Sequence, residues 1–308
     1  MKHCIYKLKF DTGVHFGKSG LTDYEICLHA DTIFSALCQE VLRLKGQKGL
    51  NQLMELVRNN QLLISDAFPF KAKQLFIPKP YIHVKKQNQD GDSSMKKQMK
   101  NMKYIQMECL SDFVNGEYSP ENIVKERDFG QGQLKTNVAI RGMSETEPYR
   151  VKYFMFEEDC GLYMIVGYET DETVFLLEEL LESLSYSGIG GKRYSGFGRF
   201  SLFSSSIPAE LEKRLTAEGS LYMTLSVSLP TQEELGEALH GASYQLVKRS
   251  GFVSSENYAE TYMRKKDLYV FYPGACFVQK YRGDIYDVSS GGNHPVYRYA
   301  KPMFLEVK

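Results

Sequence analysis

SGIGGKRYSGFGRF, residues 187–200, holds five glycines in fourteen residues and separates a segment of helical periodicity from a strand-like one. Glycine allows left-handed backbone conformations and close approach of a ligand, so a loop this rich in glycine indicates an unusual turn or a binding surface. We refer to it as the glycine loop. It also carries three cations and two central aromatic residues: Lys192, Arg193, Arg199, Tyr194 and Phe197.

The glycine loop does not fit either common nucleotide-binding motif. A P-loop needs a hydroxyl side chain after its lysine, but Arg193 follows Lys192 here. No GxGxxG window is present, and the loop follows a helix instead of preceding one, so phosphate would meet the negative end of the helix dipole. Two readings stay open. Either loop N–H groups and cations hold an RNA backbone while an aromatic ring stacks on a base, or glycine caps the helix and begins a flexible turn.

The pattern on both sides of the loop indicates an α+β unit. Apolar residues recur at helical spacing over 30–46, more briefly over 50–60, and again over 171–188. Strand-like segments occupy 4–10, 62–70, 150–156, 161–168 and 197–205. This order predicts a ferredoxin-like (RRM-like) βαββαβ unit over residues 1–205, with a long insertion at about 71–150.

The insertion changes composition along its length. Residues 71–103 carry nine lysines and two acidic residues, and the stretch QNQDGDSSMKKQMKN (87–101) within them has no periodic apolar face, so we expect a mobile surface insertion. Its lysines fit either a solvated face or contacts to an RNA backbone. The following stretch, 108–118, is predicted as a strand with a turn at Asn115–Gly116.

The last third of the chain is predicted to form a second unit. Residues 205–220 are polar and fit a linker, and strand-like segments follow a short helix at about 231–241. We expect a C-terminal ferredoxin-like domain over 216–308. Its Tyr and Phe residues fall within strands, which favours core or subunit-interface roles.

The net charge, the cysteine count and the lengths of the apolar segments restrict the class of protein. The net charge is zero, so local patterning must select the partner. The six cysteines include no CxxC pair, which favours reduced thiols in the cytoplasm over disulfides or a zinc site. No segment has the length of a signal peptide core or a membrane span. We expect no metal and no cofactor.

Several stretches resemble the RAMP superfamily of CRISPR RNA-binding proteins. The glycine loop lies between the second helix and the last strand, as in that superfamily. The N-terminal stretch HFGKSGL…HADTIFSAL resembles the subunit that binds the crRNA 5′ handle in type III-A Csm effectors, with the type III-B counterpart as a near relative. KRSGFVSS, FYPGACF and GGNHPVYRYAKPMFLEV resemble the C-terminal half of the same kind of subunit.

The resemblance implies a non-catalytic, RNA-binding ribonucleoprotein subunit in antiviral defence. Such a subunit holds the crRNA 5′ handle and contacts both a large polymerase-like subunit and a backbone RAMP subunit. A thumb-like hairpin within about 105–150 is expected to press against RNA. The RNA-binding residues implied are His15, Phe16, Gly17, Lys135, Thr136, Asn137, Arg141, Gly188, Gly190, Gly191, Lys192, Arg193, Tyr194, Ser195, Gly196, Phe197 and Arg199.

A different class of function stays open at His29. Related RAMP endoribonucleases use a histidine near the first helix as an acid–base group, and His29 directly precedes the helix expected from Ala30. The alternative is therefore a metal-independent, repeat-specific endoribonuclease. Capping or core packing also explains His29, a turn-stabilising role also explains His15, and His294 fits a structural role.

Overall fold

A seven-stranded antiparallel sheet forms the centre of the computed structural model, which describes residues 1–17, 20–83, 93–141, 145–255 and 257–308. Strand β1 (Lys2–Phe10) pairs with β8 and β9 on its two sides, and β8 pairs in turn with β2 and β3. Eight of the nine residues of β8 are buried, so both faces of this strand are covered. The remaining bounds are β2 Leu62–Ile64, β3 Phe68–Lys71, β4 Gln74–Pro78, β5 Tyr104–Gln106, β8 Cys160–Tyr168 and β9 Phe200–Ser205.

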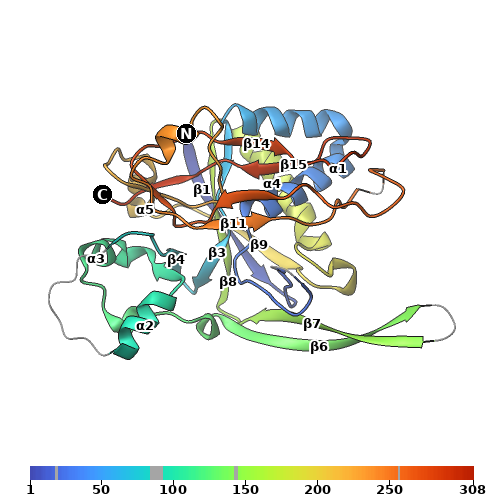
Figure 1. Cartoon of the computed structure of the whole chain (residues 1–308), viewed down its shortest axis with the longest axis horizontal. Coiled ribbons are helices and arrows are strands. Elements are labelled where there is room, and N and C mark those ends of the chain that lie inside the picture. The colour runs from blue at the N-terminus through green and yellow to red at the C-terminus, as the bar shows by residue number, and fades with distance from the viewer. Residues whose placement is uncertain (18–19, 84–92, 142–144, 256) are drawn as a thin grey trace.

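Two long helices pack beside each other against this sheet (Figure 1). Helix α1 (Ala30–Arg58) is broken at Gly46, whose φ of 62° and ψ of −161° are not helical, so the two helical segments expected from the sequence are confirmed. Helix α4 (Asp171–Ser187) is capped at its N-terminus by Thr170, whose hydroxyl accepts the N–H of Thr173. Leaving aside the elements of the insertion, β1, α1, β2 with β3, β8, α4 and β9 succeed one another in the order predicted from periodicity.

The insertion forms a small layer below the sheet and a long hairpin (Figure 1). Strands β6 (Gly130–Arg141) and β7 (Glu145–Phe156) pair along their full length, and the far end of this hairpin projects beyond the body. The rest of the layer comprises α2 Ser93–Asn101, α3 Leu110–Asn115 and three 3-10 helices, Met107–Cys109, Pro120–Asn122 and Glu126–Asp128.

Two expectations about the insertion were wrong. The start of the lysine-rich segment 71–103 is not at the surface, because Leu75, Phe76 and Ile77 of β4 are buried in the sheet. Of the stretch 87–101, residues 93–101 form helix α2, and the rest lies within 84–92, outside the described residues. Residues 108–118 are not a strand but contain α3, which buries Leu110, Phe113 and Val114 and ends at Gly116 with a φ of 82°. These three apolar residues are spaced so that they share one face of a helix, which favours a helix over a strand. The Asn-Gly pair therefore ends a helix and does not form a hairpin turn.

The C-terminal part is built from short strands. A three-stranded sheet and two two-stranded ribbons account for them. In the described part of 217–308, the α-helix found is α6, which has four residues, so the predicted second βαββαβ unit is not seen. The predicted linker 205–220 contains helix α5, whose Leu211 is buried. The bounds are α5 Ala209–Thr216, β10 Tyr222–Thr224, α6 Leu235–Ala238, β11 Leu246–Arg249, β12 Leu268–Phe271, β13 Cys276–Phe277, β14 Asp284–Asp287, β15 Tyr297–Ala300 and β16 Phe304–Glu306.

One hydrophobic core joins the C-terminal strands to the first sheet. A single cluster of buried side chains extends from β1 and α1 to β10, β15 and β16. The Asp66 N–H donates to the carbonyl of Leu225 at 2.8 Å, and the Tyr299 hydroxyl accepts the N–H of Ile64 at 3.1 Å. The two parts are therefore held in a fixed relation. No helix in the described residues combines the length and apolar character needed to cross a membrane.

Candidate nucleic-acid interface

The glycine loop folds back on itself and packs against the segment that follows β1. The Ile189 N–H donates to the carbonyl of Gly198 at 3.0 Å, which closes the loop. Gly191 and Gly198 then donate their N–H groups to the carbonyls of His15 and Gly13, each at 2.9 Å. The structure therefore brings together the two segments, 13–17 and 187–200, that the sequence marked separately.

The glycines of the loop have two different structural roles. Gly198 has a φ of 78°, and a Cβ there would overlap the carbonyl oxygen of Ile189. A Cβ on Gly190, where φ is 93°, would come within 2.7 Å of the Phe16 ring. Both are required by packing inside the protein. Gly196 differs, because its φ is 84° but nothing lies within 4 Å of its Cβ position, so it leaves open space for a ligand.

Two aromatic residues of the loop face opposite environments. The Tyr194 ring is fully exposed, whereas Phe197 is 8% exposed. Phe197 packs edge-to-face against Tyr153 of β7, with ring centroids 5.0 Å apart. Phe197 thus anchors the loop to the hairpin, and Tyr194 is the ring available for stacking on a base.

The loop cations divide between contacts to the hairpin and contacts to α1. Lys192 Nζ lies 4.7 Å from the centre of the Tyr149 ring in β7, a cation–π distance. Arg193 donates to the Gln39 side-chain oxygen at 3.2 Å and also lies near the carbonyl of Gly188. The side chain of Arg199 is exposed. The short 3-10 helix Arg193–Ser195 sets the exposed position of Ser195 at the loop tip.

His15, Phe16 and Gly17 lie beneath the loop. His15 is 6% exposed, and its Nδ1–H donates to the carbonyl oxygen of Lys152 at 2.7 Å. Phe16 is buried to the same degree, and a Cβ at Gly17 would approach His15 Nε2 to 3.1 Å. These residues hold the loop against β7. Little of the His15 and Phe16 side chains is exposed to a ligand, and direct contact of these three residues with RNA stays a prediction.

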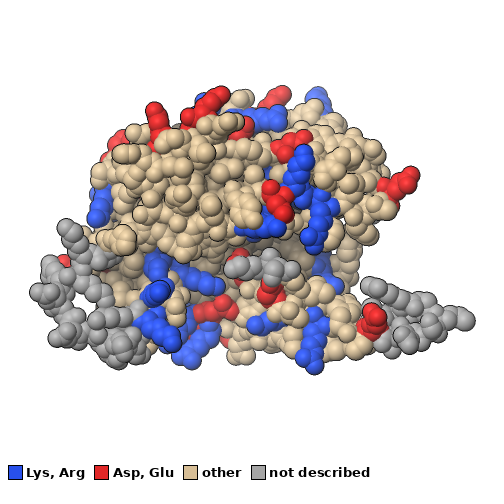
Figure 2. Space-filling model, viewed as in Figure 1, with Lys and Arg blue, Asp and Glu red and all other residues tan. Residues whose placement is uncertain are grey.

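The predicted hairpin residues lie on two faces. Side chains alternate along a strand, so Lys135 and Asn137 share one face of β6 and Thr136 takes the other. Lys135 Nζ lies 5.9 Å from the centre of the Phe197 ring, which places its face toward the glycine loop. Arg141 ends β6, and its side chain lies outside what the structure describes. In the lower part of Figure 2, most Lys and Arg side chains gather over the small layer of the insertion, and a few lie over the hairpin.

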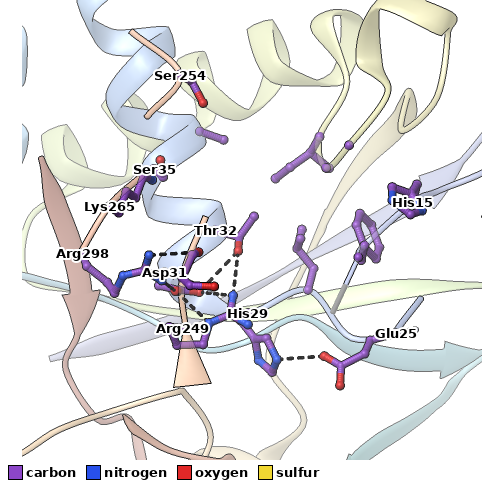
Figure 3. Close-up of a pocket in the computed structure, with 18 of the residues that line it drawn as sticks. His15, Glu25, His29, Asp31, Thr32, Ser35, Arg249, Ser254, Lys265 and Arg298 are labelled. Atoms are coloured by element: carbon purple, nitrogen blue, oxygen red, sulfur yellow. Dashed lines mark hydrogen bonds and ion pairs between the residues drawn. The ribbon is translucent and has the colours of Figure 1, made fainter. Parts of the chain in front are cut away.

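A polar cavity of about 270 Å³ lies beside the loop, and the sequence reasoning missed it (Figure 3). Asp31 in the first turn of α1 accepts two hydrogen bonds from Arg249, at 2.8 and 2.9 Å, and one from Arg298 at 2.6 Å. Burial acts to raise the pKa of Asp31, but the two guanidinium groups outweigh it and hold that pKa below its ordinary value. We call these three residues the ion cluster. Its members are up to 267 positions apart, so no local pattern could reveal it.

His29 is held in a second buried network. Its Nδ1 pairs with Asp66, and its Nε2 lies 3.1 Å from Glu25 Oε2. Burial and the charge of Arg249 act to lower the pKa of His29, but the Asp66 carboxylate prevails and that pKa lies well above its ordinary value. Asp66 also accepts the N–H groups of Ala30 and Val227, at 2.8 and 3.0 Å. The carboxylate thus joins the start of α1 to the C-terminal part.

Cys27, His29 and Asp66 place one potential metal-ligand atom each within 4.8 Å of one another. The Asp66 oxygens already accept hydrogen bonds from His29 and two backbone N–H groups. Burial raises the pKa of the Cys27 thiol to about 11, which disfavours the thiolate that binds metal. The geometry therefore fits an interdomain clamp better than a metal centre.

Comparison with known proteins gives consistent matches over the chain. Residues 7–201 match the RAMP superfamily, and residues 217–307 match the CRISPR Csm4 C-terminal domain. The "CRISPR system Cms protein Csm4" of Mycobacterium tuberculosis (strain CDC 1551 / Oshkosh) is 41% identical over 307 residues, covering 99% of this chain and 98% of that protein.

Two solved structures share the fold. A Csm4-containing crystal structure of the Csm3–Csm4 subcomplex in the type III-A CRISPR-Cas interference complex matches with a TM-score of 0.69 and 16% identity, over 99% of both chains. A crystal structure of the Csm1–Csm4 cassette in complex with AMPPNP matches with a TM-score of 0.64 and 16% identity, over 100% of this chain and 98% of that one.

Proposed function

This chain belongs to the Csm4 family of the RAMP superfamily, and from that premise we propose that it is the crRNA 5′-handle-binding subunit of a type III-A CRISPR effector. It acts in antiviral defence as a ribonucleoprotein subunit of the cytoplasm. Its task is to bind and position RNA. Cleavage is not part of that task, and the function requires neither metal nor cofactor.

The observation that carries this proposal is the packing of the glycine loop onto the hairpin. Phe197 and Lys192 contact Tyr153 and Tyr149 of β7, so loop and hairpin form one surface. That surface presents the exposed Tyr194 ring, the exposed Arg199 and the open space at Gly196. A stacking ring beside cations and an unobstructed backbone is the combination that single-stranded RNA requires.

The partners follow from the relatives. One similar structure is a complex of Csm4 with Csm3, and another is a cassette of Csm4 with Csm1. We extend both contacts to this chain, with Csm3 as the backbone RAMP subunit and Csm1 as the large polymerase-like subunit. The chain then bridges the two while it holds the handle.

The endoribonuclease alternative has weaker support. His29 is 3% exposed and paired with Asp66, and His15 is buried with its Nδ1–H donated to a backbone carbonyl. Burial and these internal contacts disfavour either imidazole as the acid–base group of RNA cleavage. Incubation of the purified chain with repeat RNA in EDTA separates the two functions, since the alternative requires cleavage products and our proposal requires intact RNA.

A salt series tests the RNA-binding proposal. Each phosphate neutralised on single-stranded RNA contributes about −0.7 to the slope of log K against log salt. Replacing Lys192, Arg193 and Arg199 together by Ala should flatten the slope by roughly two units if all three contact phosphate. A matched control replaces three exposed lysines outside the loop and hairpin: Lys73, Lys213 and Lys308. Equal slopes for the wild-type chain and the loop variant would refute the proposal.

A further inference from the structure

The cavity beside the glycine loop lies where three separate parts of the chain meet. Its lining includes residues of α1 between Asp31 and Gln39, four residues of the loop and several residues of the C-terminal part; the loop residues are Ile189, Gly190, Gly191 and Arg193. Figure 3 shows Asp31, Thr32 and Ser35 of α1 on one side, with Arg249, Lys265 and Arg298 of the C-terminal part approaching them. The wall thus combines cationic groups with hydroxyl donors, and both kinds of group bind phosphate oxygens.

The charges around the cavity do not balance. Among its lining residues, Arg193, Arg249, Lys265 and Arg298 outnumber the carboxylates of Glu25 and Asp31. Asp31 is the carboxylate that pairs with both Arg249 and Arg298. The further acceptors of these guanidinium groups are uncharged: Arg249 donates to the Thr32 hydroxyl, and Arg298 donates to the carbonyl of Ser250. The side chains that line the cavity therefore carry more positive than negative charge, and such an excess favours binding of an anion.

Two groups of the C-terminal part carry this argument further. The side chain of Arg298 is 6% exposed, and its Nε is a buried polar atom with no hydrogen-bond partner among the described residues. A buried N–H without an acceptor is unfavourable, so a bound oxygen there would be stabilising. Lys265 is partly buried; burial, followed by the charge of Arg298, lowers the pKa of its ammonium group.

The size of the cavity limits the ligand. About 270 Å³ is near the lower limit for small-molecule sites, which suits a single phosphate with part of its nucleotide and not a folded or paired RNA segment. Its border includes Gly190, Gly191 and Arg193 of the glycine loop. A strand that follows the loop surface therefore passes the cavity entrance.

We infer that this cavity is an anion site that takes one phosphate group of the bound RNA, held between the start of α1 and the C-terminal cations Lys265, Arg249 and Arg298. The inference rests on the proposed RNA-binding function and adds a role for the C-terminal part, which would then grip RNA as well as contact subunits. A free nucleotide offers the same phosphate chemistry, so the test includes one.

Lys265 provides the most direct test, because it lies outside the ion cluster that holds the two parts of the chain together. The full chain and its Lys265→Met variant are titrated with fluorescently labelled single-stranded RNA over a salt series. Loss of one phosphate contact in Lys265→Met should make the slope of log K against log salt less steep by about 0.7. Lys265→Arg should retain the wild-type slope. Lys266→Met is the matched control, since Lys266 is the next residue, exposed, and not part of the cavity lining. Thermal unfolding of each variant verifies the fold.

A second titration identifies the source of the phosphate. Adenosine monophosphate is added to the complex of the chain with labelled RNA. Weak competition that disappears in Lys265→Met supports an RNA phosphate in the cavity. If the nucleotide binds tightly and the bound RNA stays in place, the phosphate in the cavity does not come from the RNA, and the inference is refuted.

The failures of this inference and of the proposed function can be distinguished. An unchanged slope for Lys265→Met, together with a flattened slope for the glycine-loop variant, overturns the anion site and leaves the proposed function intact. Unchanged slopes in both variants overturn both.

Discussion

Tyr194 and Phe197 lie three residues apart in the glycine loop, yet the structure predicts opposite effects when each is replaced by Ala. Phe197 is buried against Tyr153, so its truncation removes packing between loop and hairpin. A buried Phe→Ala change costs about 3 kcal/mol at the low end of its range. At roughly 2 °C per kcal/mol for a chain of this length, the melting temperature should fall by about 6 °C.

Tyr194→Ala should leave the fold unchanged, because the ring is fully exposed and such surface changes stay within about 0.5 kcal/mol. Its effect should appear in RNA binding, where loss of one stacked base costs about 1–3 kcal/mol, or roughly 5- to 150-fold in Kd. The salt slope should not change, since no cation is removed. Tyr194→Phe is the matched control and should retain binding.

Two assays on the same purified proteins decide this prediction: differential scanning fluorimetry for stability, and fluorescence anisotropy with labelled single-stranded RNA for binding. The reasoning is refuted if Phe197→Ala melts like the wild-type chain while Tyr194→Ala is destabilised. It is also refuted if Tyr194→Ala binds RNA as tightly as Tyr194→Phe.

Three further predictions follow from other parts of the molecule. Replacing the distal hairpin, residues 138–148, by an Asn-Gly turn should preserve cooperative melting, since this segment pairs within the hairpin and leaves Tyr149 in place, and should weaken RNA retention; loss of cooperativity would contradict this. The pKa of His29 is raised in the folded state, so its pairing with Asp66 stabilises most below pH about 6.5, and this contribution is lost as pH rises through the raised value. The stability difference between wild type and His29→Gln in urea unfolding should therefore shrink from pH 6 to pH 9, and a constant difference would exclude the charged pair. Gly198→Ala should destabilise the chain by more than Gly196→Ala. Both substitutions put Ala into a left-handed conformation, which costs about 1–2 kcal/mol, but only the Cβ at position 198 also overlaps a backbone carbonyl. Equal melting temperatures for the two variants would argue against the loop closure described here.

The sequence was sufficient for the elements with strong periodicity. The helices over 30–46 and 171–188 and the strand over 4–10 were predicted close to their observed bounds, because apolar spacing directly reflects a face that must be buried. The break between the first two helical segments was also predictable, since Gly46 stands where the pattern is interrupted. Local composition misled elsewhere: the lysines of 71–103 obscured the short apolar run that enters the sheet as β4.

The candidate site was only partly predictable. The glycine loop was visible from composition, but Phe197 and Tyr194 could not be distinguished, because the burial of Phe197 depends on Tyr153 in a strand 44 positions away. The cavity was not predictable at all, since Asp31, Arg249 and Arg298 meet only after the C-terminal strands pack on α1. The residues next to an isolated arginine in a strand do not indicate which distant carboxylate it will contact in the fold.

The central claim is that the surface around the glycine loop holds the 5′ handle of crRNA within an assembled effector. The most direct measurement is photo-crosslinking of the complex reconstituted with its large subunit, backbone RAMP and crRNA, followed by mass spectrometry of the crosslinked peptides. The account predicts that handle nucleotides crosslink to peptides containing Tyr194. A complex that retains crRNA, but whose handle crosslinks only to other subunits or to segments away from the loop and hairpin, would contradict it.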